Sequence, residues 1–261
     1  MRRKFIAGNW KMHNGPAATK EFFGKFAAEL KGSPEVEKAI AEGREEVAFF
    51  VPAVSLLTAV SESKDTPLII GAENCHWEPK GAFTGETSVP MIAEIGATHT
   101  LVGHSERRHV FRETDEELNR KMHAALEGGL SAVLCVGETL EEREANKAFE
   151  VIRTQFVEGL KGVDAGTVAE KVIIAYEPVW AIGTGKTASA GDAEEVCRYI
   201  RRLADESFGS EAAEMLIILY GGSVKPENTK GIMSQPDVDG VLVGGASLKP
   251  EVFIEIVRNA L

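Results

Sequence analysis

The sequence predicts an α/β protein built as a single (β/α)₈ barrel, and three observations lead to this expectation. Eight short apolar runs alternate with segments of helical character along the chain. The runs are apolar throughout, which is typical of parallel strands buried on both faces. No linker, low-complexity stretch or shift in composition divides residues 1–261, so we expect one domain. Eight such units in about 250 residues suit a closed barrel better than an open doubly wound sheet.

The elements follow from apolar spacing and from residues that start or stop them. Phe22, Phe23 and Phe26 recur at helical spacing, and Pro52 and Pro178 end strands because proline cannot donate to a ladder. The predicted strands are Lys4–Asn9, Glu46–Val51, Leu68–Ala72, His99–Val102, Ala132–Val136, Val172–Tyr176, Met215–Tyr220 and Val238–Val243. The predicted helices are Ala17–Lys31, Val54–Ser63, one opened by Pro90, one from Ser105, Asp115–Glu127, Leu140–Leu160, Asp192–Glu206 and Pro250–Asn259.

Charge and composition narrow the function classes. The formal net charge of −11 argues against binding to nucleic acid or to an anionic membrane, although a local pocket can still attract a small anion. Cys75, Cys135 and Cys197 are far apart and form no C-x-x-C pair, which suits free thiols in a reducing cytoplasm. No apolar stretch approaches the roughly 20 residues of a membrane span, and the apolar run after Met1 is too short for a signal peptide.

Barrel enzymes carry their chemistry at the carboxyl ends of the strands, and Glu177 follows the sixth predicted strand. A glutamate taken at random is most often a surface or capping carboxylate. Here the next loop carries Trp180 and Ile182, which can remove water from Glu177 when the loop closes. Loss of water raises the basicity of a carboxylate, so the sequence indicates that Glu177 is a general base beneath a mobile lid.

Two cationic or electrophilic candidates follow other strands. His104 begins a helix, whose N-terminal partial charge disfavours imidazolium, so we expect a lowered pKa and a neutral ring that polarises a carbonyl. The alternative is a histidine that only caps the helix. Lys11, near Asn9 after the first strand, is either a surface lysine or a fixed charge that stabilises a developing enolate.

Glycine pairs follow the seventh and eighth strands. Gly221 and Gly222 precede Ser223, and Gly244 precedes Gly245. Glycine lets backbone N–H groups approach an anion, and barrels often bind phosphate at this place. Each pair alone could be ordinary turn glycine, but together they indicate an anion site.

Other motifs give weaker readings. Residues 183–187 resemble the end of a phosphate-binding P-loop, but that motif requires glycine at the position of Trp180. A loose dinucleotide-binding fingerprint starts at Gly183, but it lies too far beyond the strand end. Glu106 and His109 have metal-ligand spacing on a helix, but no second pair accompanies them. Cys75 and His76 are adjacent and poorly placed to share a metal. We therefore expect no metal and no cofactor.

Seven stretches together resemble the triosephosphate isomerase family from end to end. They are Ala7–Lys11, Gly81–Glu86, Val102–Arg108, Cys135–Glu138, Ala175–Gly185, Tyr220–Val224 and Val243–Leu248. Single motifs of this kind are weak, whereas all seven in order are highly specific. The resemblance implies a TIM barrel without metal or organic cofactor that interconverts dihydroxyacetone phosphate and D-glyceraldehyde 3-phosphate through an enediolate, in glycolysis and gluconeogenesis. Alternatives are a non-catalytic phosphosugar-binding barrel or another aldose–ketose isomerase acting on a phosphosugar.

The resemblance also implies a role for each matching residue. Glu177 would move the proton between carbons, His104 would act on the oxygens, and Lys11 with Asn9 would bind substrate and stabilise the enediolate. Glu106 would support Lys11 and His104. The phosphate would be held by Gly183, Ser223, Gly244 and Gly245.

A homodimer is a further implication of the family. The loop Glu73–Ser88 would reach into the partner, with Thr84 near the partner's active site and Glu86 facing Arg107. Phe83 at an exposed loop tip fits such a contact. Two departures stand out: Glu73 replaces a glutamine frequent in the family, and residues 188–192 replace a stretch frequently richer in Thr and Pro. Neither falls on a catalytic position.

Overall fold

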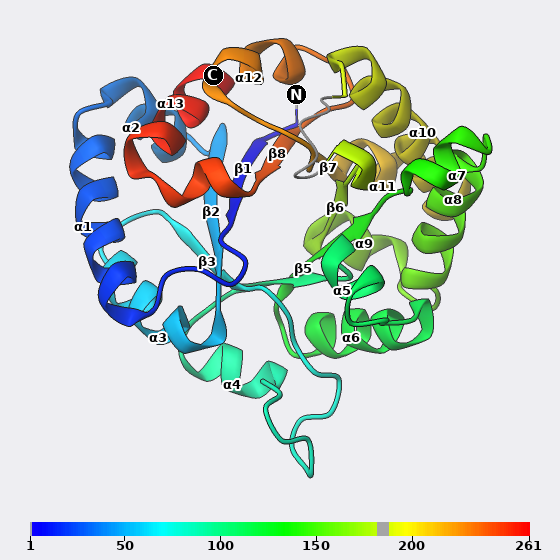
Figure 1. The fold of residues 1–261 in the computed structure, drawn as a ribbon, viewed down its shortest axis with the longest axis horizontal. Helices are drawn as coiled ribbons and strands as arrows, with labels where there is room; N and C mark the ends of the chain where they lie inside the picture. Colours follow the sequence, from blue (N-terminus) through cyan, green and yellow to red (C-terminus); the bar gives the residue numbers. More distant parts are fainter. Residues whose placement is uncertain (1, 182–187) are drawn as a thin grey trace.

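Eight parallel strands close into a barrel in which each strand pairs with the next and β8 pairs with β1. This computed structural model describes residues 2–181 and 188–261. Figure 1 shows the strands at the centre and the helices around them. The strands are β1 Lys4–Asn9, β2 Glu45–Val51, β3 Ile69–Ala72, β4 His99–Val102, β5 Ser131–Val136, β6 Val172–Tyr176, β7 Ile217–Tyr220 and β8 Gly240–Val243. The predicted (β/α)₈ barrel is confirmed.

The helices lie outside the barrel and mostly match the predicted segments. They are α1 Pro16–Lys31, α2 Pro34–Ala41, α3 Ala53–Ser63, α4 Val89–Glu94, α5 Ser105–His109, α6 Asp115–Glu127, α7 Leu140–Glu144, α8 Ala148–Gly159, α9 Ala165–Lys171, α10 Ala190–Phe208, α11 Ser210–Met215, α12 Pro226–Met233 and α13 Pro250–Ala260. Two 3₁₀ turns, η1 Val179–Ala181 and η2 Gly245–Leu248, follow β6 and β8. The short helices α2, α9, α11 and α12 have no counterpart in the prediction. Within the described residues, no helix has the length and apolarity needed to cross a membrane.

The predicted continuous helix Leu140–Leu160 is wrong, because the chain turns at Asn146. Asn146 has a φ of 57°, in the left-handed region that asparagine tolerates better than most residues. The N–H of Lys147 donates to the carbonyl of Glu142 at 2.8 Å, and that of Asn146 donates to Arg143 at 3.0 Å. These two bonds satisfy the last carbonyls of α7 and end it, so α8 starts as a separate helix.

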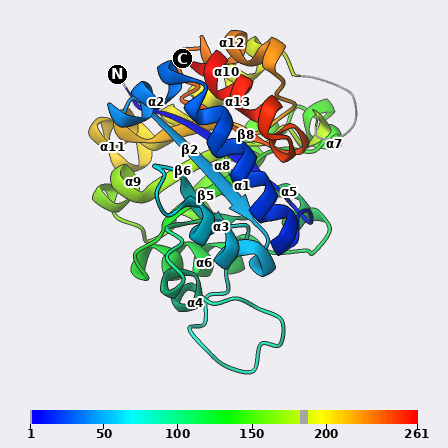
Figure 2. The same cartoon turned by 90° about the vertical axis from the view of Figure 1, so that its left-hand side faces the viewer.

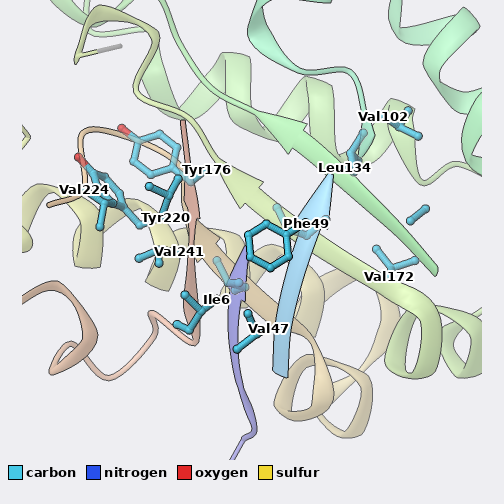
Figure 3. Packing of buried hydrophobic residues seen from close by; sticks show 14 of the residues in the cluster. Ile6, Val47, Phe49, Val102, Leu134, Val172, Tyr176, Tyr220, Val224 and Val241 are labelled. Carbon is cyan, nitrogen blue, oxygen red and sulfur yellow. The ribbon is translucent and has the colours of Figure 1, made fainter. Parts of the chain in front are cut away.

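Alternating strand residues divide the core into two layers. One buried cluster contains only strand residues, among them Phe5, Phe50 and Leu242, and fills the barrel interior. The larger cluster joins the outward strand residues to the helices. Figure 3 shows part of this layer, where Phe49 lies beside Ile6 and Val47. Both faces of each strand are therefore buried, which explains the absence of polar alternation in the sequence.

The segment between β3 and α4 leaves the barrel. Figures 1 and 2 both show it extending away from the rest of the chain next to α4. Residues 73–88 contain no helix or strand, only a single bridge between His76 and Ser88. The rings of Trp77 and Phe83 lie 4.3 and 4.2 Å from that of His76, so the projecting segment is packed on itself.

Candidate active site

A cavity of about 340 Å³ opens at the carboxyl ends of the strands, a size suited to a small ligand. Residues after β1, β4, β6, β7 and β8 meet there because parallel strands end at the same rim. The predicted site residues that line it are Asn9, Lys11, His104, Glu177, Ser223, Gly244 and Gly245. Glu106 lines a neighbouring cavity instead, and Gly183 lies outside the described residues.

Glu177 is held at the cavity floor by both its backbone and its side chain. Its side chain is almost fully buried, and its Oε2 accepts the N–H of Ser105 at 2.8 Å. Its own N–H donates to the carbonyl of Val136 at 2.8 Å. Burial opposes a charge on Glu177, but contact with His104, the Ser105 N–H and the charge of Lys11 outweigh burial and lower the pKa of Glu177. In this arrangement Glu177 is ionised.

Two glycines make room for Glu177. A Cβ atom added to Gly137 would lie 1.7 Å from the carbonyl oxygen of Glu177, and one added to Gly221 would lie 2.9 Å from its Cγ. No side chain fits at the first distance without displacing backbone. Gly137, directly after β5, thus allows Glu177 to take its position, although Gly137 itself does not line the cavity.

His104 occupies the N-cap of α5, as its place before Ser105 predicts. Its Nδ1 accepts the N–H of Glu106 at 3.2 Å, and its Nε2 lies 2.9 Å from Oε1 of Glu177. A ring nitrogen that accepts a backbone N–H carries no proton. The neutral ring with its proton on Nε2 therefore satisfies both contacts, as an electrophile requires.

The expected lowering of the His104 pKa is wrong for this arrangement. Burial lowers the pKa of His104. The charge of Glu177 and the hydrogen bond to it raise this pKa by more than burial lowers it, so the net direction is upward. The sequence did not reveal this contact, because Glu177 comes from a different strand. When the carboxylate of Glu177 moves away, burial and the charge of Lys11 remain, and both lower the pKa of His104.

Lys11 is held in a strained backbone conformation beside the cavity. Its φ is 56°, uncommon for a residue with a side chain, and its N–H donates to Oδ1 of Asn9 at 3.1 Å. Its Nζ lies 2.7 Å from Oε1 of Glu106. Glu106 thus contacts Lys11 through its carboxylate and His104 through its backbone N–H.

The glycine pair after β8 lies next to Lys11. The hydroxyl of Ser247 donates to the carbonyl of Gly244 at 2.7 Å and fixes the turn after β8, where η2 begins. A Cβ at Gly244 would lie 3.7 Å from Cε of Lys11, whereas one at Gly245 would meet nothing within 4 Å. The glycine pair therefore opens backbone N–H groups to the cavity next to a lysine, a setting that favours a phosphate.

Glu138 is a buried residue of this region that the sequence reasoning did not assign. Its Oε1 accepts from the hydroxyl of Tyr176 at 3.1 Å, from Nε1 of Trp180 at 2.8 Å and from Arg143 at 3.0 Å. Figure 3 shows Tyr176 next to Tyr220 on the neighbouring strand. Glu138 thereby ties η1, the segment directly after Glu177 and Pro178, to the barrel. Its position two residues after β5, directly after Gly137, was the available signal.

Glu73, one of the two departures noted in the sequence, lies close to the site. Burial raises its pKa to about 8, although the N–H of Lys11 lowers it. Glu73 lines the second cavity together with Asn9, Lys11 and Glu106. The additional carboxyl of Glu73 therefore lies near Lys11 at the rim of the barrel.

The described residues offer no cluster of metal ligands. Among residues 2–181 and 188–261, no group of three or more His, Cys, Asp or Glu side chains could hold a metal ion. Cys75, Cys135 and Cys197 are all buried and unpaired. The polar groups of the cavity are those of acid–base chemistry.

Proton transfer within a small phosphorylated molecule is the chemistry for which this rim is equipped, and the protein is an isomerase of the (β/α)₈-barrel class. The family profile described as triosephosphate isomerase matches residues 4–260. The chain belongs to the triosephosphate isomerase family.

Curated relatives agree over the full length. The triosephosphate isomerases of Geobacter metallireducens and Caldanaerobacter subterraneus are each 48% identical to the chain, over 99% of it and over 99% and 100% of their own lengths. That of Latilactobacillus sakei is 46% identical over 99% of both chains. The predicted family is confirmed.

Proposed function

We propose that Glu177, His104, Lys11 and Asn9 carry out the reaction of this family in the cavity at the strand ends. The reaction is the interconversion of dihydroxyacetone phosphate and D-glyceraldehyde 3-phosphate, a step of glycolysis and gluconeogenesis. One observation carries the assignment of roles: Nε2 of His104 and Oε1 of Glu177 are 2.9 Å apart on the floor of a cavity that also contains Lys11. A base and an electrophile within reach of the same small molecule are what enolisation requires.

The proposed steps use the contacts already described. Glu177 exchanges its bond to His104 for the substrate, takes a proton from the carbon next to the carbonyl, and returns it to the neighbouring carbon. The freed Nε2–H of His104 donates to the substrate oxygens and shuttles the proton between them. Lys11, with Asn9, stabilises the negative charge that develops on the enediolate.

The phosphate is proposed to lie against Ser223, Gly244 and Gly245. Their backbone N–H groups can approach an anion, and the cavity joins them to the catalytic groups. Gly183, which lies outside the described residues, is proposed to complete this pocket when substrate is bound. No step of this scheme uses a metal or an organic cofactor.

A coupled isomerase assay on Glu177→Gln tests the catalytic assignment. We expect turnover to fall by roughly three to five orders of magnitude, because both the base and its positioning are lost. The thermal unfolding midpoint should remain close to that of the unmodified protein. Glu37→Gln, an exposed change of the same type, is the matched control and should keep full turnover.

Two alternatives are separated by the same assay. A non-catalytic phosphosugar-binding barrel would bind the substrate without turnover in the unmodified protein. Another aldose–ketose isomerase would turn over longer sugar phosphates faster than triose phosphates. Near-normal turnover of Glu177→Gln would overturn the role of Glu177 without changing the family.

The proposed assembly is a homodimer formed through the loop Glu73–Ser88. Phe83 is 42% exposed, and Met12 on the rim is 95% exposed, which is unusual for large apolar side chains outside an interface. A second cavity of about 350 Å³, lined by Met12, Glu86, Arg107 and the exposed Phe111, adjoins the active site and can accept a loop tip. Within one chain Arg107 pairs with Glu113 at 2.6 Å, so a contact with the partner's Glu86 would compete with that pair.

Light scattering after gel filtration tests this assembly. Phe83→Glu should convert the dimer to monomer and reduce turnover, because the loop tip, with Thr84, is proposed to complete the partner's site. Val157→Glu changes a partly exposed apolar residue of α8 and should leave the dimer intact. A monomeric unmodified protein would contradict the proposal.

We further propose that residues 1–261 act as one catalytic domain in the cytoplasm, binding neither nucleic acid nor membrane, given the net charge of −11.

A further inference from the structure

A second lysine lines the active-site cavity, and the catalytic scheme does not use it. Lys225 lies two residues after Ser223, at the N-cap of α12, and its side chain is exposed. Among the described residues, no carboxylate lies within ion-pair distance of its ammonium. Lys11, by contrast, is paired with Glu106 at 2.7 Å. Lys225 is therefore a cation of the cavity wall whose charge no ion pair offsets.

The backbone of Lys225 is fixed relative to the anion pocket. Its N–H donates to Oδ1 of Asn228 at 2.8 Å, and Nδ2 of Asn228 donates to the carbonyl of Ser223 at 3.0 Å. These two bonds tie Ser223 and Lys225 to the first turn of α12, a helix whose N-terminal partial charge has the same sign as the lysine. The turn thus has a defined place, while the long side chain can extend over the cavity mouth.

The net negative charge of the protein gives a positive residue at the cavity, such as Lys225, a role in attracting an anionic substrate. The chain carries a formal net charge of −11, and a phosphate ester carries about −1.5 to −2 at pH 7. A substrate of this kind is repelled by the molecule as a whole and needs a local positive field to enter the cavity. Since Glu106 offsets Lys11, Lys225 is the unpaired lysine that can supply this field among the described residues lining the cavity.

We propose that Lys225 captures the phosphate group of the substrate and guides it onto Ser223 and the glycine pair. This inference rests on the proposed function and extends it with a residue of the binding step. Lys225 is a specificity-determining residue for dianionic substrates, and it takes no part in the proton transfers. Its contact with phosphate is the same before and during the chemical step, so it contributes to kcat/KM and leaves kcat unchanged.

Charge variants of Lys225 give a quantitative test. At about 20 mM ionic strength we expect Lys225→Gln to lower kcat/KM roughly two- to fivefold and Lys225→Glu roughly tenfold or more, through KM. These factors should shrink towards one at about 0.5 M salt, because surface charges are then screened within a few ångströms. Lys225→Arg, which keeps the charge, should restore most of kcat/KM.

Lys230 provides the matched control. It lies on the same helix, is exposed, and does not line the cavity, so Lys230→Gln and Lys230→Glu change the net charge equally. We expect these variants to change kcat/KM less than twofold at any ionic strength. Thermal unfolding of each variant shows whether the fold is kept.

Inorganic phosphate is the probe that does not depend on turnover. Calorimetric titration should give a dissociation constant that rises several-fold in Lys225→Glu and stays constant in Lys230→Glu. Equal phosphate affinity in these two folded variants, or a kcat/KM of Lys225→Glu equal to that of Lys230→Glu at low salt, would overturn the role of Lys225. Absence of isomerase turnover in the unmodified protein would overturn the proposed function instead, and the phosphate titration would still decide the role of Lys225.

Discussion

His104 and Glu177 form a buried pair in which Nε2 of the imidazole lies 2.9 Å from Oε1 of the carboxylate. Burial favours the neutral form of each group, so it raises the pKa of Glu177 and lowers that of His104. Their mutual contact outweighs burial, and the net result is a lowered pKa of Glu177 and a raised pKa of His104. In the proposed reaction the substrate displaces one partner, so the raised pKa of His104 belongs to the free site. When Glu177 leaves, the charge and the hydrogen bond that favour protonation of His104 are lost, and burial and Lys11 favour the neutral form that the proposed reaction needs.

The first prediction concerns this coupling. In Glu177→Gln the pKa of His104 should fall, because the charge and the hydrogen bond that raise it are lost while burial and Lys11, which lower it, remain. An NMR titration of the His104 ring, assigned with a His104→Asn sample, measures it. Glu106→Gln is the control and should shift this pKa less, because Glu106 is the smallest contributor. An unchanged His104 pKa in Glu177→Gln would show that the two groups do not titrate together.

The same pair affects stability in a defined direction. Because the folded pKa of His104 lies above its ordinary value of 6.5, its contribution to the free energy of unfolding is fully present below that value and is lost as the pH rises through the folded pKa. Urea unfolding of the unmodified protein and of Glu177→Gln at pH 5.5 and 8.5 compares the two. The difference between the proteins should be larger at the lower pH.

A second prediction follows from the space left at Gly137. Gly137→Ala places a methyl group on the carbonyl of Glu177, so the strand end must move by about 1 Å or more, and a shift of that size costs about a hundredfold in rate. We expect kcat to fall by at least that factor and the unfolding midpoint to drop. Gly24→Ala is the control, since a Cβ at that position in α1 meets nothing within 4 Å. It should stabilise the protein by about 0.5–1 kcal/mol without changing kcat.

Glu138 supplies a third prediction. Glu138→Gln keeps the size of the side chain but removes the charge and introduces N–H groups among donors such as Tyr176 and Arg143. The free energy of unfolding should fall by about 2–4 kcal/mol. Urea unfolding measures this change. Glu141→Gln, an exposed substitution on α7, should stay within about 0.5 kcal/mol of the unmodified protein. Equal stability of the two variants would contradict the structural role of Glu138.

A fourth prediction comes from Glu45 at the start of β2. Its side chain is fully buried, neither carboxyl oxygen has a hydrogen-bond partner among the described residues, and burial raises its pKa from 4.5 to about 8. Between these values the folded protein holds a proton that the unfolded chain releases, so stability falls as the pH rises, by at most about 1.4 kcal/mol per unit. Glu45→Gln removes this dependence.

Urea unfolding from pH 5 to 9 checks the behaviour of Glu45. The unmodified protein should lose stability relative to Glu45→Gln up to about pH 8 and run parallel to it above. Glu37→Gln, an exposed change on α2, should leave the pH profile as it is. Parallel profiles of all three proteins would mean that Glu45 ionises normally in the folded state.

The sequence predicted the strands closely, because apolar runs bounded by proline, glycine or polar residues carry the signal locally. His99–Val102 and Val172–Tyr176 agree in both ends. The end of α7 was harder to predict from the sequence. Asn146 ends this helix through its backbone conformation, which is stabilised by two N–H to carbonyl hydrogen bonds and does not follow from residue type alone. Short helices such as α2 and α9 were missed because they contain too few turns for apolar spacing to be distinctive.

The sequence by itself determined the barrel, the family and the residues that line the rim, since each candidate follows a strand and all strands of a parallel barrel end together. Only the tertiary structure decided how these residues affect one another. The contact of Glu177 with His104 and the space beneath Gly137 join residues from different strands. So does the pairing of Lys11 with Glu106, whereas Lys225 has no ion-pair partner among the described residues. Charges and close contacts depend on distance in space, and neighbours across a barrel are far apart along the chain.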